Sequence, residues 1–112
     1  MQINTKQKKF LKGLSHNIKP SIIIGKDGLT SGTLHSIVQA LENKELIKIK
    51  FNAFKDKKNE LAKNIELETK SSIISKIGNV FIYFRQNPDI EKRKYFLDKK
   101  IWESILLSLY QV

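Results

Sequence analysis

The sequence contains no cysteine, which excludes disulfide bridges and metal sites built on thiolates. Histidine is scarce as well, since His16 and His35 are the only two and no HxH pair or HExxH motif occurs. Paired carboxylates and a Ser-His-Asp order are also missing. We therefore expect a protein that is not an enzyme and that holds no cofactor and no metal ion.

Long apolar runs are absent too, because no stretch approaches the ~18 residues that a membrane-spanning helix requires. Residues 1–14 carry charge but lack the apolar centre of a signal peptide, so we expect a cytoplasmic location and no membrane association. With 112 residues, the chain is expected to form one domain around a single modest core.

Acidic residues are few in relation to basic ones. Twenty-one lysines and arginines face eleven aspartates and glutamates, which leaves a net charge of +10, and nineteen of the basic residues are lysine. A folded domain this basic repels itself, and a polyanionic partner is the usual reason for that cost. Nucleic acid is the first candidate and an anionic membrane surface the second. A lysine-rich composition without a functional cause is the third interpretation.

The spacing of apolar residues predicts a small α/β domain over residues 1–97, with elements in the order α-β-α-β-α-β-β. Strands that alternate with helices imply a mixed four-stranded sheet with helices packed on it. Helices are expected at 5–14, 30–44 and 56–69, and strands at 21–24, 46–51, 73–77 and 80–85. The last two strands form a hairpin across Gly78-Asn79, a pair that tolerates positive φ.

The helices are expected to differ in their apolar faces. In the first, Thr5 can cap the N-terminus, and Phe10 and Leu14 share one face. The second has a core-facing stripe at i, i+3, i+4 and i+7, formed by Leu34, Ile37, Val38 and Leu41.

Two strands carry cations that could face a partner. The strand at 46–51 alternates strictly, so one face is buried while Lys48 and Lys50 face solvent. Lys76 and Arg85 join them if the hairpin aligns that way. In the final strand only one face is expected to be core, either that of Phe81, Tyr83 and Arg85 or that of Val80, Ile82 and Phe84.

Residues 98–112 are expected to form an amphipathic helix that extends the domain. Residues 1–97 hold all of the net charge of +10, whereas residues 98–112 hold two basic and two acidic groups. The extension is therefore not the expected nucleic-acid surface. It either covers part of its own domain or provides a dimer or protein contact.

The stretch from Ile24 to Thr30 is the most informative part of the sequence. Gly25 and Gly28 flank Lys26 and Asp27 just before a helix, and two glycines let a backbone approach a phosphate closely. The exposed N–H groups and the positive end of the helix dipole favour an anion there. An ordinary turn between a strand and a helix remains the alternative interpretation of this G-x-x-G loop.

Other glycine-rich motifs fit this loop less well. No Lys-Ser or Lys-Thr follows the second glycine, as a Walker A loop requires, and the third glycine of a dinucleotide fingerprint is missing. The KH domain also clamps nucleic acid with a G-x-x-G loop, but that loop joins two helices. Here Pro20 and three isoleucines precede the loop, which favours a strand and leaves KH as the alternative fold.

Several motifs occur together in a fixed order over residues 1–90. They are Thr5-Lys6-Gln7-Lys8, Leu11-Lys12-Gly13-Leu14, Lys19-Pro20, the stretch from Ile24 to Thr30, Glu45-Leu46-Ile47-Lys48, Ile77-Gly78 and Tyr83-Phe84-Arg85. In these motifs the chain resembles the YhbY family of bacterial stand-alone CRM domains. The resemblance implies a fold similar to the C-terminal domain of translation initiation factor 3 and an RNA-contacting G-x-x-G loop. It also implies association with precursors of the large ribosomal subunit, and plant relatives use the domain in group II intron splicing.

The expected RNA-binding residues combine the loop with the surrounding cations. They are Gly25, Lys26, Asp27, Gly28, Lys6, Lys8, Lys9, Lys12, Lys19, Lys48, Lys50 and Arg85. The sequence departs from the family at Asn79, where a basic residue is expected, and in residues 98–112. A general RNA chaperone or a DNA-binding nucleoid protein remains the alternative function, although the second helix offers only Gln39 and Asn43 for reading base edges.

Overall fold

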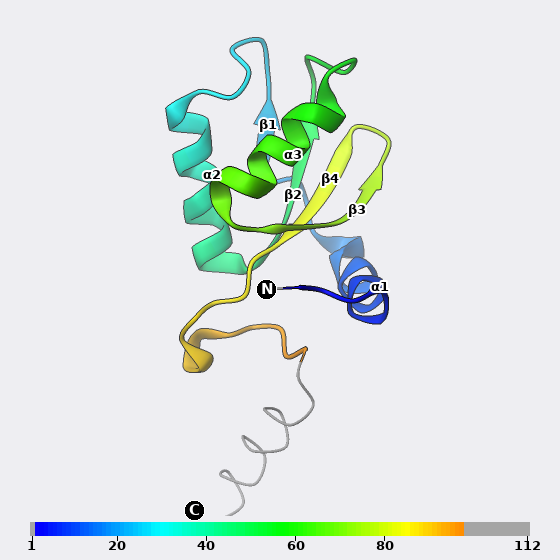
Figure 1. Ribbon diagram of the computed structural model, residues 1–112, viewed down its shortest axis with the longest axis vertical. Helices are drawn as coiled ribbons and strands as arrows, with labels where there is room; N and C mark the ends of the chain where they lie inside the picture. The colour runs from blue at the N-terminus through cyan, green and yellow to red at the C-terminus, as the bar shows by residue number, and fades with distance from the viewer. Residues whose placement is uncertain (1, 98–112) are drawn as a thin grey trace, which may run out of the picture.

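The computed structural model describes residues 2–97, and over this range the elements follow the predicted order (Figure 1). The strands form one mixed sheet in the order β1-β2-β4-β3, in which β1 is parallel to β2 and the other neighbours are antiparallel. The elements are α1 (Thr5–Leu14), β1 (Ile22–Ile24), α2 (Ser31–Lys44), β2 (Leu46–Phe51), α3 (Lys58–Thr69), β3 (Ser72–Ile77) and β4 (Val80–Phe84). The predicted fold class is confirmed, and the helix predicted at 98–112 lies outside the described residues.

Helices α2 and α3 cover one face of the sheet (Figure 1). The apolar stripe of α2 supplies Ile37 and Leu41, both fully buried, while Ala62 and Ile65 come from α3. They pack on the inward residues of the strands, which include Ile24, Ile47, Ile49, Phe51, Phe81 and Tyr83. Because the alternation in β2 places these side chains on one side, the larger part of the core lies between the two helices and the sheet.

Helix α1 covers part of the opposite face, which gives the domain a second, smaller core. Leu11 is fully buried there against Leu46, Ile82 and Phe84. Strand β4 is consequently buried on both sides, and all four residues from Phe81 to Phe84 are at most 3% exposed. The expectation that only one face of this strand is core was wrong, because α1 folds back over a sheet face that alternation alone leaves open.

The apolar face and the cap of α1 also differ from the prediction. Phe10 and Leu14 are 51% and 43% exposed, whereas Leu11 points into the core. The N-cap is Asn4 rather than Thr5: its side chain accepts the N–H of Gln7 at 2.8 Å, and the Gln7 side chain accepts the N–H of Asn4 at 3.0 Å. This reciprocal pair is a capping box, so the cap lies one residue before the predicted one and Thr5 is the first residue of the helix.

Glu45 ties the segment after β4 to the body of the domain. It follows α2 with φ of 64° and is 1% exposed. Its carboxylate accepts the backbone N–H groups of Asn87, Lys94 and Tyr95, at 2.6, 2.5 and 3.2 Å. The buried charge is thus satisfied by three donors, and residues 87–95 are held against the end of α2.

Candidate nucleic-acid interface

The G-x-x-G loop lies at the end of the sheet where β1 stops and α2 begins (Figure 1). The Gly28 N–H donates to the Gly25 carbonyl at 3.1 Å, which closes a tight turn with Lys26 and Asp27 exposed at its tip. Gly28 has φ of +66°, a conformation that favours glycine. Thr30 then caps α2 by accepting the Thr33 N–H at 3.1 Å. A strand leads into the loop, whereas a KH loop is preceded by a helix as well as followed by one.

A second loop packs beside the first and adds side chains that sequence reasoning did not select. The Ile24 carbonyl accepts the N–H groups of Asn52 and Ala53 at 2.9 and 3.2 Å, which ties the end of β1 to the segment after β2. Phe54 follows, and a Cβ added to Gly28 would lie 3.3 Å from its Cε2 atom. Glycine is therefore favoured at position 28 by its φ, and a side chain there would also displace this ring.

The second loop also carries cations. The Lys57 N–H donates to the Phe54 carbonyl at 2.9 Å, and this turn exposes Lys55, Asp56 and Lys57. Lys58 is half-buried, and its ammonium group donates to Gly78 O and Asn79 Oδ1 at 3.2 and 2.9 Å. Asn79, where a basic residue was expected, instead holds the hairpin turn to the start of α3.

Lys48 and Lys50 lie on the face of the sheet that α1 only partly covers. Leu46, Lys48 and Lys50 share this face of β2, and they are buried, half-buried and exposed in that order. Lys50 stands in a cross-strand row with Ile23 and Ile77, which are 58% and 55% exposed. This face of the sheet is therefore open next to the G-x-x-G loop and covered by α1 at its other end.

The N-terminal lysines lie away from the loop. Helix α1 sits near the opposite end of the sheet (Figure 1), and it has no acidic residue in its first turn. Lys6, Lys9 and Lys12 are exposed, as is Lys19 after the helix, whereas Lys8 is half-buried. Of the predicted cations, Lys26 alone thus lies at the G-x-x-G loop, the lysines of α1 lie near the opposite end of the sheet, and Lys48 and Lys50 lie on the sheet face between them.

Arg85 is not brought together with Lys48 and Lys50. Its backbone N–H donates to the Glu45 carbonyl at 2.9 Å, at the end of the sheet far from the loop. Lys76 does not join them either. Its ammonium group donates to Asn59 of α3 at 2.8 Å and lies 5.7 Å from the centroid of Phe81, so it belongs to the face covered by α3.

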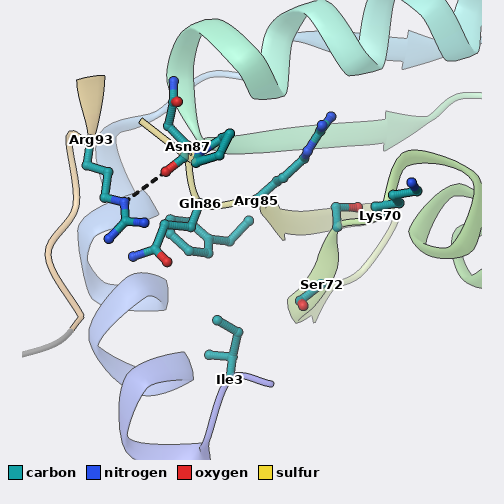
Figure 2. Close-up of a pocket in the computed structure, with 10 residues that line it drawn as sticks. Ile3, Lys70, Ser72, Arg85, Gln86, Asn87 and Arg93 are labelled. Atoms are coloured by element: carbon teal, nitrogen blue, oxygen red, sulfur yellow. Dashed lines mark hydrogen bonds between the residues drawn. The ribbon is translucent and has the colours of Figure 1, made fainter. Parts of the chain in front are cut away.

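Arg85 instead lines a hollow of about 480 Å³ together with Lys70 and Arg93 (Figure 2). Arg93 Nε donates to the Asn87 carbonyl at 2.8 Å. Figure 2 shows the side chains of Arg85 and Arg93 pointing away from one another. The only two arginines of the chain thus line the same hollow without pointing toward one another.

Within residues 2–97, no group of three histidine, aspartate or glutamate side chains is placed to hold a metal ion. In the same part of the chain, no helix has both the length and the apolar character needed to cross a bilayer.

Comparison with known proteins identifies the family. Residues 3–85 match the CRS1/YhbY (CRM) domain. The chain belongs to this family. A relative from Haemophilus influenzae, named an RNA-binding protein, is 38% identical over 99 residues, which are 88% of this chain and 97% of the relative. A second, from Pseudomonas aeruginosa and named a probable RNA-binding protein, is 33% identical over 93 residues, 82% of this chain and 89% of its own.

A solved structure shares the fold of this CRM domain. It is the solution structure of a hypothetical Staphylococcus aureus protein regarded as a candidate RNA-binding protein, with 34% sequence identity and a TM-score of 0.69. The match covers 85% of this chain and all of the S. aureus chain. The resemblance drawn from the sequence motifs is thereby confirmed at the level of the family.

Proposed function

We propose that this CRM protein binds RNA, and that the G-x-x-G loop makes the central contact with the RNA backbone. The observation that carries the proposal is the open space at Gly25, where no atom lies within 4 Å of an added Cβ, although the loop itself is a closed turn. A phosphate can therefore approach the peptide backbone closely there. The relatives named RNA-binding proteins support RNA as the ligand.

The neighbouring groups favour an anion at this loop. Lys26 is exposed at its tip, and the N-terminus of α2 follows immediately. The helix dipole and unpaired N–H groups at such a terminus stabilise negative charge. Asp27 and Asp56 offset part of the local charge of Lys26, Lys55 and Lys57, so the attraction is moderate and depends on backbone N–H groups as well as on side chains.

The lysines outside the loop extend the surface along the molecule. Lys50 and Lys48 continue from the loop across the open sheet face, and the lysines of α1 lie beyond them. Contacts of this kind position a protein on phosphates and read little sequence. Arg85 lies off this path, and any RNA contact that it makes would belong to a second site.

The finer proposal is that the RNA is ribosomal and that the protein acts in the cytoplasm on precursors of the large subunit. It rests on the family, whose bacterial stand-alone members it resembles. Crosslinking the protein to RNA in cells and sequencing the recovered RNA tests it. We expect the crosslinked RNA to be large-subunit ribosomal RNA. Recovery of messenger or intron RNA would contradict the ribosomal target, and recovery of DNA would refute RNA binding.

A further inference from the structure

Exposed aromatic side chains are rare in this protein. Among residues 2–97 only Phe10 and Phe54 are exposed, at 51% and 39%, while the other aromatic residues are buried or half-buried. Phe10 lies on α1, beside Phe96 and Leu97. Phe54 is the exposed aromatic residue that touches the proposed RNA-binding loop.

The backbone around Phe54 is fixed on both sides. The two preceding N–H groups are bound to the Ile24 carbonyl, and the Phe54 carbonyl accepts the N–H of Lys57. Phe54 itself has φ of +55°, in the left-handed region that bulky side chains rarely adopt. Such unfavourable conformations cluster at functional sites.

Core packing does not account for this position. The ring contacts Gly28 through one edge yet keeps more than a third of its surface exposed. The residues that follow it, Lys55 to Lys57, are all exposed and polar. An apolar ring held at the rim of a phosphate-binding loop, next to cations, has the arrangement that proteins use to stack on nucleic-acid bases.

We propose that Phe54 stacks on an unpaired RNA base whose adjoining phosphate lies at the loop of Gly25 to Gly28. This inference rests on the proposed function, since the loop holds the backbone and the ring holds the base. A base and its phosphate are joined through a single sugar, and the ring touches the loop directly, so one nucleotide can meet both. The ligand is thus a loop, bulge or single-stranded end of RNA, because a base in a continuous helix is already stacked.

Stacking of this kind tolerates any base, because every base has a π-face. The proposed contact therefore distinguishes paired from unpaired RNA without reading a sequence. It adds a structural preference to a surface whose lysines alone would bind duplex and single strand alike.

The test uses Phe54→Leu, which keeps an apolar side chain but removes the ring, and Phe54→Trp, which restores one. Two RNA probes are compared, a hairpin with a uridine-rich loop and a blunt duplex of the same stem. Phe54→Leu should bind the hairpin about 5- to 150-fold more weakly and the duplex with unchanged affinity, while Phe54→Trp should bind both as the parent does. Equal hairpin affinity of the leucine variant and the parent overturns the proposal.

The parent protein provides a second measurement that does not depend on how a variant folds. In its complex with the hairpin, nuclear Overhauser contacts between the Phe54 ring and a loop base are expected, and their absence overturns the proposal. Lys26→Glu separates the two levels of inference. If this variant loses affinity while Phe54→Leu does not, the stacking proposal fails and the RNA-binding loop stands; if neither loses affinity, the proposed loop site fails as well.

Discussion

Alanine at Gly25, Gly28 and Gly78 should have three different effects on stability, because the structure gives each glycine a different reason to be there. Gly25 does not have a positive φ, and the space around it is open. Alanine there should therefore change the free energy of unfolding by less than about 1 kcal/mol, and the expected change is a stabilisation. Gly78 has φ of +60° and equally open space. Alanine there carries the cost of the left-handed conformation alone, about 1–2 kcal/mol.

Gly28 combines that backbone conformation with a crowded neighbour. Its φ is +66°, and an added Cβ would lie 3.3 Å from Phe54 Cε2, so the ring must move slightly to make room for it. Gly28→Ala should therefore cost the same ~1–2 kcal/mol as Gly78→Ala and a further amount for displacing the ring. Gly78→Ala is the matched control, because the difference between the two variants isolates the contact with Phe54.

Urea unfolding of the three variants measures these differences. Each kcal/mol should also lower the melting temperature by roughly 4 °C or more in a domain of this size. The expected order of stability is Gly25→Ala above Gly78→Ala above Gly28→Ala. Equal losses at all three positions would refute the assignment of strain to particular glycines. Gly25→Ala should then be the clean probe of RNA affinity, which it should weaken without loss of fold.

Three further predictions concern the core and the segment after β4. Leu11→Ala should cost about 2–5 kcal/mol of unfolding free energy, whereas Phe10→Ala should cost far less because its ring is half exposed; similar losses would contradict the placement of α1. Glu45→Gln should lower protection from hydrogen exchange at Asn87 or at Lys94 while β2 stays protected, because the amide keeps one acceptor oxygen and turns its NH2 group toward the other N–H donor; unchanged protection at both would rule out this anchoring role. Burial raises the pKa of Tyr83, and the charge of Glu66 adds to the effect, so the folded protein should lose stability as pH rises above ~10. Tyr83→Phe should lose less stability over the same pH range, and parallel curves of unfolding free energy against pH for the two proteins would contradict this prediction.

The order of elements could be predicted because it depends on local patterns. The stripe in α2 and the alternation in β2 each place a face toward the core without reference to the rest of the chain. The burial of both faces of β4 could not be predicted in this way. It depends on where α1 packs. The sequence of that helix does not show this, because Phe10 and Leu14 are exposed and Leu11 alone is buried.

The candidate site divides in the same manner. The G-x-x-G loop is contiguous in the sequence, and its glycines are visible there. Phe54 comes beside it only because β1 and β2 are parallel neighbours with Ile24 opposite Phe51. The separation of Arg85 from Lys48 likewise follows from the register of β2 and β4, which places Arg85 beyond the paired ends of the strands. Sequence spacing carries no information on either relation.

The central claim is that the G-x-x-G loop contacts RNA, and a comparison of Lys26→Glu with Lys63→Glu tests it most directly. Lys63 is exposed on α3, outside the proposed surface. Both variants replace a lysine with a glutamate, so they change the net charge equally. Affinity for a structured RNA should be measured between about 50 and 200 mM salt. Lys26→Glu should bind much more weakly than Lys63→Glu and should reduce the log–log salt slope by about 1. Equal affinities and equal slopes for the two variants would show that the loop makes no contact with RNA and would contradict the account.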